Sequence, residues 1–323
     1  MKAVVYTEYG SPDVLQLKEV EKPTPEDNGV LIKIHATTVN RTDCGFLRAK
    51  PFIVRFFSGL AKPRNTILGN EFAGQIEAIG KDVTSFAVGD NVFGFDGDTF
   101  GAHAEYMAMP EDGVLATMPA GMSYVEAAPS NEGAHYALNY IKKADIQQGK
   151  NVLINGATGA IGSAAVQLMK YFGAEVTAVS DTARLELVKS LGATRVIDYE
   201  KEDFTQLDEA FDVVFDAVGK STFFKCKPLL KPDGIYFSTE PGPYWQNPLL
   251  ALWTPFFSRK KLKFPIPKHT KGDIEFFKEL IEAGEYKPVI DRTYPMEQII
   301  EAYKYVEQGQ KTGNVVITVD HNN

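Results

Sequence analysis

The segment Asn151–Lys170 constrains the fold of this chain more than any other. A short apolar run ends in a glycine-rich turn, and the turn opens directly into an amphipathic helix. A second apolar run, Glu175–Ser180, follows about one helix later and completes a strand–helix–strand unit. The turn carries Gly156, Gly159 and Gly162, so backbone N–H groups and a helix N-terminus can face a pyrophosphate. In this setting the pattern predicts a nicotinamide dinucleotide site.

Length and composition exclude several other classes of protein. A chain of 323 residues with 44% hydrophobic and 24% charged residues predicts roughly two globular domains. The net charge of −8 argues against nucleic acid as the main partner. Only Cys44 and Cys226 are present, which suits a reducing compartment, and no apolar run approaches the length of a membrane span. We therefore expect a cytoplasmic protein.

The order of strands and helices predicts two domains. Short strands at Lys2–Thr7, Leu15–Val20 and Val30–Ala36 are separated by turn residues, which is typical of a small barrel. A helical run from Tyr124 to Lys143 leads into the glycine turn, and strands then alternate with helices, which predicts a doubly wound parallel sheet. The later expected elements are Thr182–Leu191, Arg195–Ile197, Val213–Asp216, Phe223–Leu230, Gly234–Ser238, Gly272–Ala283, Met296–Gln308 and Asn314–Val319. The fold class is thus α/β. The expected domains are 1–123 with 269–323, and 124–268.

Several motifs along the whole chain resemble one family. They are Val39–Asp43, Gly69–Gly74, Val88–Phe93, Gly101–Tyr106, the Gly156–Gly162 loop and Lys287–Ile290. The chain resembles the medium-chain dehydrogenase/reductase superfamily, within it the zinc-independent quinone oxidoreductase-like branch. The resemblance implies a GroES-like barrel as catalytic domain, a Rossmann domain and an NADPH site in the cleft between them. We also expect a homodimer.

The residues at the expected zinc positions argue against a metal. Zinc-binding members of the family place cysteine and histidine where this chain has Asn40, Asn70 and the Ser130/Asn131 region. Neutral amides and hydroxyls are poor zinc ligands beside thiolate and imidazole. Cys44 with His35 or His103 could contribute to an improvised site, but we expect no metal.

The end of the second Rossmann strand bears on the choice of cofactor. Ser180 stands where an acidic residue would favour NADH, and Arg184 can reach back one helical turn toward a 2′-phosphate, whereas Asp181 opposes such a phosphate. NADPH is therefore the expected cofactor, with NADH as the alternative. The expected cofactor contacts are Asn40, Gly133, Gly156, Thr158, Gly159, Ala160, Ile161, Gly162, Ser180, Arg184, Tyr199, Ala217, Val218, Gly219, Ser238 and Thr239.

The sequence offers fewer candidates for catalytic residues than for cofactor contacts. The resemblance places Asn40 at the nicotinamide ribose, and Asp43 is expected at the same site or as an orienting neighbour. Glu71 is either a contact for an arginine or a buried structural acid. Glu132 departs from the family pattern beside Gly133, and it either alters the choice of acceptor or points to solvent. No residue stands out as a general acid.

Together these features predict a zinc-independent, NADPH-dependent reductase of small quinones or α,β-unsaturated carbonyls. Alternatives are an alcohol or aldehyde dehydrogenase and a non-catalytic NADPH-binding sensor. Two interpretations remain for the apolar segments Phe46–Leu60 and Pro243–Lys263. Each segment forms either a cavity lid or dimer interface, or a surface that docks at an anionic membrane.

Overall fold

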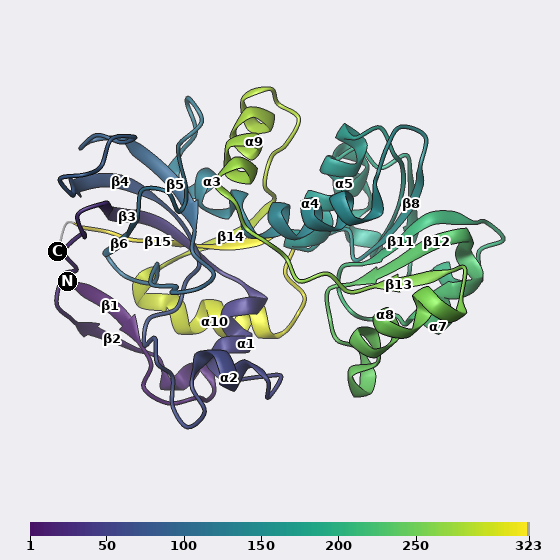
Figure 1. Cartoon of the computed structure of the whole chain (residues 1–323), viewed down its shortest axis with the longest axis horizontal. Coiled ribbons are helices and arrows are strands. Elements are labelled where there is room, and N and C mark those ends of the chain that lie inside the picture. Colours follow the sequence, from purple (N-terminus) through teal and green to yellow (C-terminus); the bar gives the residue numbers. More distant parts are fainter. Residues whose placement is uncertain (322–323) are drawn as a thin grey trace. The chain divides into compact units, whose positions relative to one another are not determined.

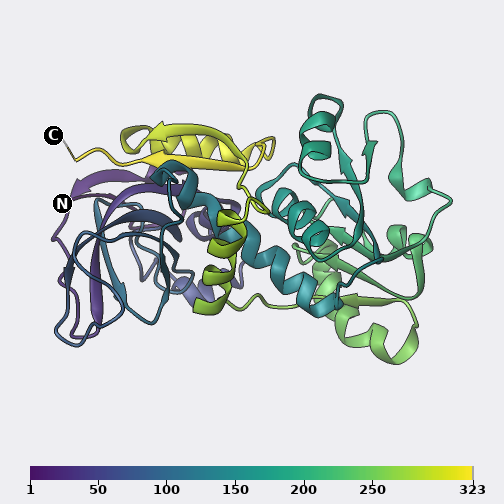
Figure 2. The same ribbon diagram turned by 90° about the horizontal axis from the view of Figure 1, so that it is seen from above.

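The computed structural model describes residues 1–321 and divides the chain into two compact units. Unit 1 comprises Met1–Glu132, His269–Ala283 and the segment from Pro288 to the C-terminus. Unit 2 comprises Gly133–Lys268 and Gly284–Lys287. The N-terminus and the last described residues both belong to unit 1 (Figures 1 and 2).

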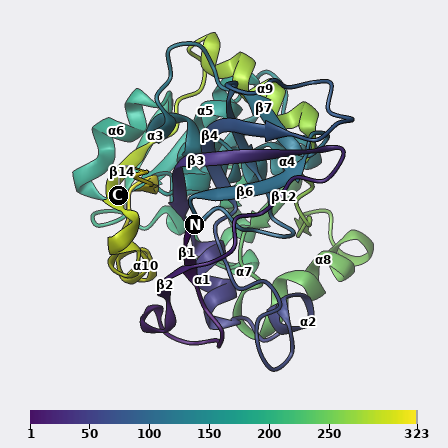
Figure 3. The same ribbon diagram turned by 90° about the vertical axis from the view of Figure 1, so that its left-hand side faces the viewer.

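Unit 1 is built on a curved, mostly antiparallel sheet in the order β14-β15-β3-β4-β5-β7, with β6 also paired to β3. Its strands are β3 (Gly29–Val39), β4 (Glu71–Ile79), β5 (Asn91–Phe95), β6 (Tyr106–Pro110), β7 (Val114–Thr117), β14 (Ile290–Pro295) and β15 (Asn314–Thr318). A separate pair, β1 (Lys2–Val5) and β2 (Gln16–Glu19), lies beside it. Figure 3 shows β3, β4 and β6 side by side. The predicted GroES-like barrel is confirmed.

The core of unit 1 follows from the alternation along β3. Val30, Ile32 and Ile34 are fully buried and belong to one apolar cluster, which also takes in Tyr303 and Val306 from helix α10 (Ile299–Glu307). The other helices of unit 1 are α1 (Arg41–Arg48), α2 (Val54–Ser58), α3 (Tyr124–Ala127) and α9 (Lys271–Glu282). The alternate side chains of β3 that point toward α10 are therefore buried in the core of unit 1.

Unit 2 is a six-stranded sheet in the order β10-β9-β8-β11-β12-β13, in which all pairs are parallel. Its strands are β8 (Asn151–Asn155), β9 (Glu175–Ser180), β10 (Arg195–Asp198), β11 (Phe211–Asp216), β12 (Leu230–Ser238) and β13 (Lys261–Lys263). Its helices are α4 (Glu132–Ala144), α5 (Ala160–Tyr171), α6 (Leu185–Ser190), α7 (Phe223–Cys226) and α8 (Gln246–Phe257). The predicted doubly wound sheet is confirmed.

The two faces of this sheet are covered by different helices. Tyr140 of α4 packs over Phe215 and Phe237, with ring centroids 4.7 Å and 5.1 Å away. On the opposite face, Leu250 and Ala251 of α8 pack against the cluster that contains α7. In Figure 1, α4 and α5 accordingly lie on one side of β11 and β12, and α7 and α8 on the other. Both sides of the parallel sheet are thus buried, as its continuous apolar strands require.

Prolines break two of the predicted helices. The run Tyr124–Lys143 is interrupted by a 3₁₀ turn at Ala128–Ser130, where Pro129 has φ −82° and ψ 17°. The predicted helix Phe223–Leu230 ends as α7 at Cys226, and a 3₁₀ turn at Lys227–Leu229 contains Pro228. Proline lacks the N–H that continues the helical ladder, which explains both breaks.

The unit boundaries also differ from the predicted domain limits. The first boundary falls after Glu132 rather than after residue 123, because Ala127 and Ala128 pack into the barrel cluster with Phe93. Gly284–Lys287 belongs to unit 2, where the backbone N–H and carbonyl of Lys287 both bond to the Gln167 side chain.

Several elements were not foreseen. They include helix α8, which contains Pro255 near its C-terminal end, and the edge strand β13. Among the described residues, no helix combines the length and the apolar character needed to cross a membrane.

Candidate active site

The glycine loop forms a tight turn between β8 and α5. Gly156 adopts φ 82°, a left-handed conformation that favours glycine. A Cβ on Gly156 would overlap the Val218 side chain, and a Cβ on Gly162 would overlap the carbonyl oxygen of Gly156. Gly133 is equally restricted, since its Cβ would lie 2.7 Å from the carbonyl oxygen of Ala160. These three glycines therefore serve close backbone packing.

Gly159 differs from the other glycines of the loop. It caps the N-terminus of α5 with an extended backbone, and the nearest atom to a Cβ there would be 3.9 Å away. Thr158, Gly159, Ala160 and Ile161 thus surround an open helix N-terminus, where backbone N–H groups are available to an anion. A helix N-terminus of this kind is the feature that binds the pyrophosphate in dinucleotide-binding folds.

The neighbouring strands end at the same edge of the sheet. Asp216, the last residue of β11, is aligned with Asn155 of β8 and Ser238 of β12. Its carboxylate is fully buried and accepts hydrogen bonds from the Asn155 side chain (3.0 Å), the Ser221 backbone (2.8 Å) and the Tyr236 hydroxyl (3.1 Å).

These bonds fix the backbone just beyond the strands. The predicted residues Ala217, Val218, Gly219, Ser238 and Thr239 accordingly lie at the strand ends beside the glycine loop, where doubly wound sheets bind their ligands. Asp216 and Asn155 were not predicted as site residues, because a buried strand-end acid carries no sequence signal of its own.

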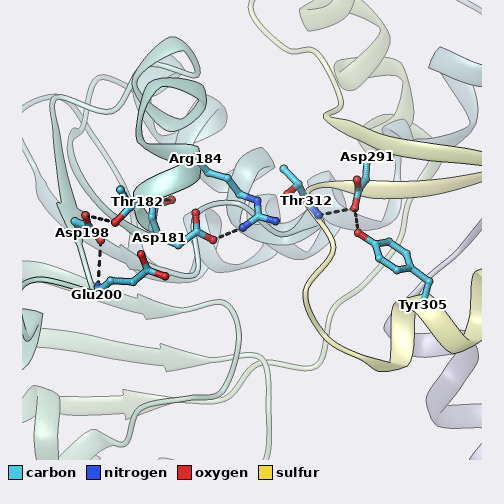
Figure 4. A network of polar contacts seen from close by, with 9 residues as sticks. Asp181, Thr182, Arg184, Asp198, Glu200, Asp291, Tyr305 and Thr312 are labelled. Atoms are coloured by element: carbon cyan, nitrogen blue, oxygen red, sulfur yellow. Dashed lines mark hydrogen bonds and ion pairs between the residues drawn. The ribbon is translucent and has the colours of Figure 1, made fainter.

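Ser180, Asp181, Arg184 and Tyr199 gather at the end of β9. The Ser180 hydroxyl is buried, and its backbone carbonyl accepts the Tyr199 N–H at 3.0 Å. Arg184 pairs with the Asp181 carboxylate (Figure 4). Partial burial raises the pKa of the Tyr199 phenol, and the nearby Asp181 charge adds to this effect. The carboxylate that would oppose a phosphate is therefore neutralised by its own neighbour.

Unit 1 contains a second polar centre, built around Glu71. This carboxylate is fully buried and accepts hydrogen bonds from the Thr38 hydroxyl (2.8 Å) and the Asn40 amide (2.7 Å). Two backbone N–H groups, of Asn131 (2.9 Å) and Glu132 (2.5 Å), also donate to it. Burial raises the pKa of Glu71, whereas these four donors lower it. Glu71 is a structural acid that contacts no arginine among the described residues.

Asn40 and Asp43 are joined at the start of α1. The Asp43 carboxylate accepts the backbone N–H groups of Asn40 (2.8 Å) and Gly69 (3.0 Å) and has no exposed surface. Burial raises its pKa to about 7 against the effect of these bonds. The side chain of Asp43 is thus directed at the backbone, while Asn40 is held by Glu71.

Glu132 points inward rather than to solvent. It is only 5% exposed, and one carboxyl oxygen bonds to the Thr42 hydroxyl. Burial raises the pKa of Glu132 to about 8, with the charges of Glu71 and Asp43 adding to the effect. Of the two readings of Glu132, the one that placed it in solvent is wrong.

Lys311 provides a cation close to these acids. Desolvation lowers the pKa of Lys311, and the charges of Glu132 and Glu71 oppose that shift. Its loop is held by Asp291, which accepts the Thr312 N–H (2.9 Å) and the Tyr305 hydroxyl (2.6 Å), as Figure 4 shows. Neither Lys311 nor Thr42 was predicted, because nothing in the sequence links them to Glu132. We call Asp43, Glu71, Glu132 and Lys311 the acid cluster.

The comparisons with known proteins agree with this architecture. Residues 26–120 match the family model "Alcohol dehydrogenase GroES-like domain", and residues 191–317 match "Zinc-binding dehydrogenase". The chain is 35% identical to the 2-methylene-furan-3-one reductase of Solanum lycopersicum, over 98% of this chain and 79% of that protein. It is 31% identical to the NADPH-dependent alkenal/one oxidoreductase of Arabidopsis thaliana, with the same coverage.

Among solved structures, the quinone oxidoreductase from Coxiella burnetii matches with a TM-score of 0.88 and 26% identity, over 99% of both chains. The chain belongs to the medium-chain dehydrogenase/reductase superfamily. Within that superfamily it falls in the quinone oxidoreductase-like branch, as its motifs predicted. Members of this branch are NAD(P)-dependent oxidoreductases, which accords with the open helix N-terminus at Gly159.

In this medium-chain dehydrogenase/reductase, the residues proposed for an improvised zinc site are otherwise engaged. The ring nitrogens of His103 contact the Thr38 carbonyl (2.8 Å) and the Tyr303 hydroxyl (3.3 Å), and burial lowers its pKa to about 4. His35 stacks on Tyr124 at 4.4 Å. Burial raises the pKa of the Cys44 thiol. Within residues 1–321, no three His, Cys, Asp or Glu side chains are grouped so as to hold a metal ion.

Proposed function

We propose that this chain is a zinc-independent, NADPH-dependent reductase that transfers a hydride to a quinone or to the C=C bond of an α,β-unsaturated carbonyl compound. The observation that carries the proposal is the open helix N-terminus at Gly159, set among glycines that tolerate no side chain. The full-length similarity to an alkenal/one oxidoreductase and a furanone reductase supports this class of acceptor.

The residues of unit 2 would hold the cofactor. Backbone N–H groups of the Gly156–Gly162 loop would bind the pyrophosphate, and the strand-end residues 217–219 and 238–239 would bound the nicotinamide half. When bound, the cofactor supplies the hydride. The chain's task is to orient it, which the bonds of Asp216 to Asn155, Ser221 and Tyr236 favour by fixing that backbone.

Arg184 is the basis for preferring NADPH. Its guanidinium lies near Tyr199 and would contact a 2′-phosphate bound at the end of β9, and its pairing with Asp181 offsets the repulsion expected from that carboxylate. Arginine binds phosphate with directed, charge-assisted hydrogen bonds. NADH lacks this group and would gain nothing from Arg184.

The acid cluster would supply the proton that balances the hydride. Glu132 is held in its neutral form near pH 7 and directly precedes Gly133, which the family resemblance places near the nicotinamide. Asn40, in the same hydrogen-bonded group, is the expected contact of the nicotinamide ribose. We propose Glu132 as the proton source, with Thr42 as its hydrogen-bonded neighbour and Asp43 as a positioning residue.

Zinc independence rests on the donor set. The family resemblance implies that Asn40 and Asn70 correspond to zinc-ligand positions of metal-dependent relatives, and amide groups hold zinc poorly. Polarisation of the acceptor carbonyl would then depend on hydrogen-bond donors. Such donors suit quinones and enones, which accept hydride more readily than simple aldehydes.

Parallel assays of NADPH oxidation with quinones, enones and aldehydes test the substrate class. We expect turnover of the first two. Clear reduction of aldehydes without either of the others would overturn the proposal. Cofactor binding without turnover of any acceptor would instead indicate a sensor. The homodimer and the cytoplasmic location stay predictions.

A further inference from the structure

An apolar stripe on helix α8 faces outward instead of toward the core. Leu249, Leu252, Trp253, Phe256 and Phe257 are 60%, 70%, 65%, 81% and 74% exposed, respectively. Their spacing of three and four residues puts them on one side of the helix, a pattern that normally faces a protein core. We call these five residues the α8 stripe.

The helix itself is firmly attached to unit 2 by its other side. Leu250 and Ala251 pack into the apolar cluster of the sheet, and the buried Thr254 exchanges hydrogen bonds with the backbone of Leu262 (3.0 Å and 3.3 Å). Figure 1 shows α8 beside α7 along this face of the sheet. The outward direction of the stripe is therefore fixed by packing and does not result from a loosely held helix.

The chain segment that contains the α8 stripe is strongly basic. Residues 217–268 contain nine lysines and arginines but only two acidic residues, Asp233 and Glu240, whereas the whole chain has a net charge of −8. Of the nine, only Lys231 and Arg259 have a salt-bridge partner within the described part of the chain. Two of these lysines lie together just beyond α8, because Lys260 follows the helix by three residues and its ammonium donates to the Lys227 carbonyl (2.9 Å).

The positive charge of this segment determines which kind of partner the α8 stripe can bind. A second copy of the chain, related by a two-fold axis through the α8 stripe, would bring two sets of lysines together. A water-exposed aromatic and aliphatic helix face flanked by lysines instead suits a bilayer whose headgroups are anionic. Tryptophan, present here as Trp253, favours the headgroup level of such a bilayer.

We propose that the α8 stripe and its flanking lysines dock this protein on the surface of an anionic phospholipid bilayer. The stripe would insert at the level of the headgroups, and the lysines would contact the lipid phosphates. Docking would bring the enzyme to the phase in which apolar acceptors dissolve. The proposal goes beyond the proposed function and does not depend on it.

Co-sedimentation of the full-length protein with vesicles tests the proposal without cofactor or acceptor. We compare vesicles of phosphatidylcholine alone with vesicles containing about one third phosphatidylglycerol. Binding to the anionic vesicles should be about tenfold stronger and should weaken at about 0.5 M salt. Equal binding to both kinds of vesicle, or no binding to either, would overturn the proposal.

Two variants separate the apolar and the electrostatic contributions. Phe256→Ser/Phe257→Ser should weaken binding about tenfold, because both rings would be withdrawn from the bilayer. Lys225→Gln/Lys227→Gln, at the last turn of α7 and the 3₁₀ turn that follows it, should weaken it by a similar factor on anionic vesicles only. Tyr171→Ser, at an exposed ring at the end of α5, is the control and should bind like the wild type.

Light scattering of the same variants tests whether a second copy of the chain covers the α8 stripe instead. Both phenylalanines are exposed, so the double variant should keep the wild-type melting temperature and oligomeric state. A change from dimer to monomer would assign the α8 stripe to a second copy and contradict the proposal. Because these experiments use no NADPH, their failure would leave the reductase proposal standing.

Discussion

The glycine loop of unit 2 and the acid cluster of unit 1 are built on opposite principles. The loop has no charged side chain, and its chemistry lies in backbone N–H groups exposed where Gly159 leaves space. The acid cluster is made of buried titratable side chains, and its Asp43 and Glu71 carboxyl groups accept backbone N–H groups. The first suits a ligand that brings its own charge, and the second suits the storage of a proton.

This difference determines what substitutions should do at each centre. Where the backbone forms the site, an added methyl group is the damaging change, since it fills space that the chain or the ligand needs. Where buried carboxyl groups form the site, removal of one acceptor leaves several buried donors without a hydrogen-bond partner and out of reach of water.

Glu71→Ala should cause the largest loss of stability. It removes the acceptor of four donors, so we expect the free energy of unfolding to fall by about 4 kcal/mol. Thermal unfolding measures this, with Glu77→Ala, at an exposed acid of the same strand, as control. A loss no larger than that of the control would show that Glu71 does not organise the acid cluster.

Gly162→Ala should lower the stability of the protein nearly as much. Gly159→Ala should weaken cofactor binding without lowering stability. The new Cβ at position 162 overlaps the Gly156 carbonyl, which should cost about 3 kcal/mol of stability. At position 159 the Cβ has space within the protein, so the melting temperature should be unchanged. NADPH fluorescence titration should nevertheless show weaker binding in both variants. Unchanged binding by Gly159→Ala would contradict the placement of the pyrophosphate.

Glu132→Gln should act on turnover rather than on cofactor affinity. Removal of the proton source should lower kcat about 100-fold, while the Kd for NADPH stays unchanged. In the wild type, kcat should fall as the pH rises through about 8, whereas the variant should show no such fall. Equal pH profiles for the two proteins would exclude Glu132 as the donor.

Stability should depend on pH through the same group. The pKa of Glu132 is raised by folding, so its contribution is complete below the ordinary carboxyl range and is lost as the pH rises through about 8. The melting temperature of Glu132→Gln, relative to the wild type, should therefore increase between pH 6 and pH 9. A constant difference would show that Glu132 does not take up a proton on folding.

Arg184→Ala should have the smallest effect, confined to one cofactor. We expect the KM for NADPH to rise about tenfold and that for NADH to stay unchanged. Arg195→Ala, at an exposed arginine paired with Glu209, is the control. Equal changes for both cofactors would show that Arg184 does not recognise the 2′-phosphate.

The sequence predicted the loop better than it predicted the acid cluster, for a physical reason. The loop is contiguous, so its spacing, the strand before it and the helix after it are all visible in one segment. The acid cluster joins α1, β4, the first residue of α4 and the loop of Lys311, and its members meet only through the fold. Glu132 was noticed as a departure from the family pattern, but its burial and its bond to Thr42 could not be predicted.

The secondary-structure errors have equally local causes. Pro129 and Pro228 ended helices that apolar periodicity alone extended. Helix α8 was missed because it carries an apolar stripe and a proline, which together resemble an irregular packing segment.

The position of the transferred hydride tests the central claim most directly. The protein is given an α,β-unsaturated ketone and NADPH deuterated at C4 of the nicotinamide, and the product is analysed by NMR. We expect a saturated ketone with deuterium on the carbon β to the carbonyl. Deuterium on the carbonyl carbon itself, in an unsaturated alcohol, would contradict it and assign the chain to alcohol dehydrogenase chemistry.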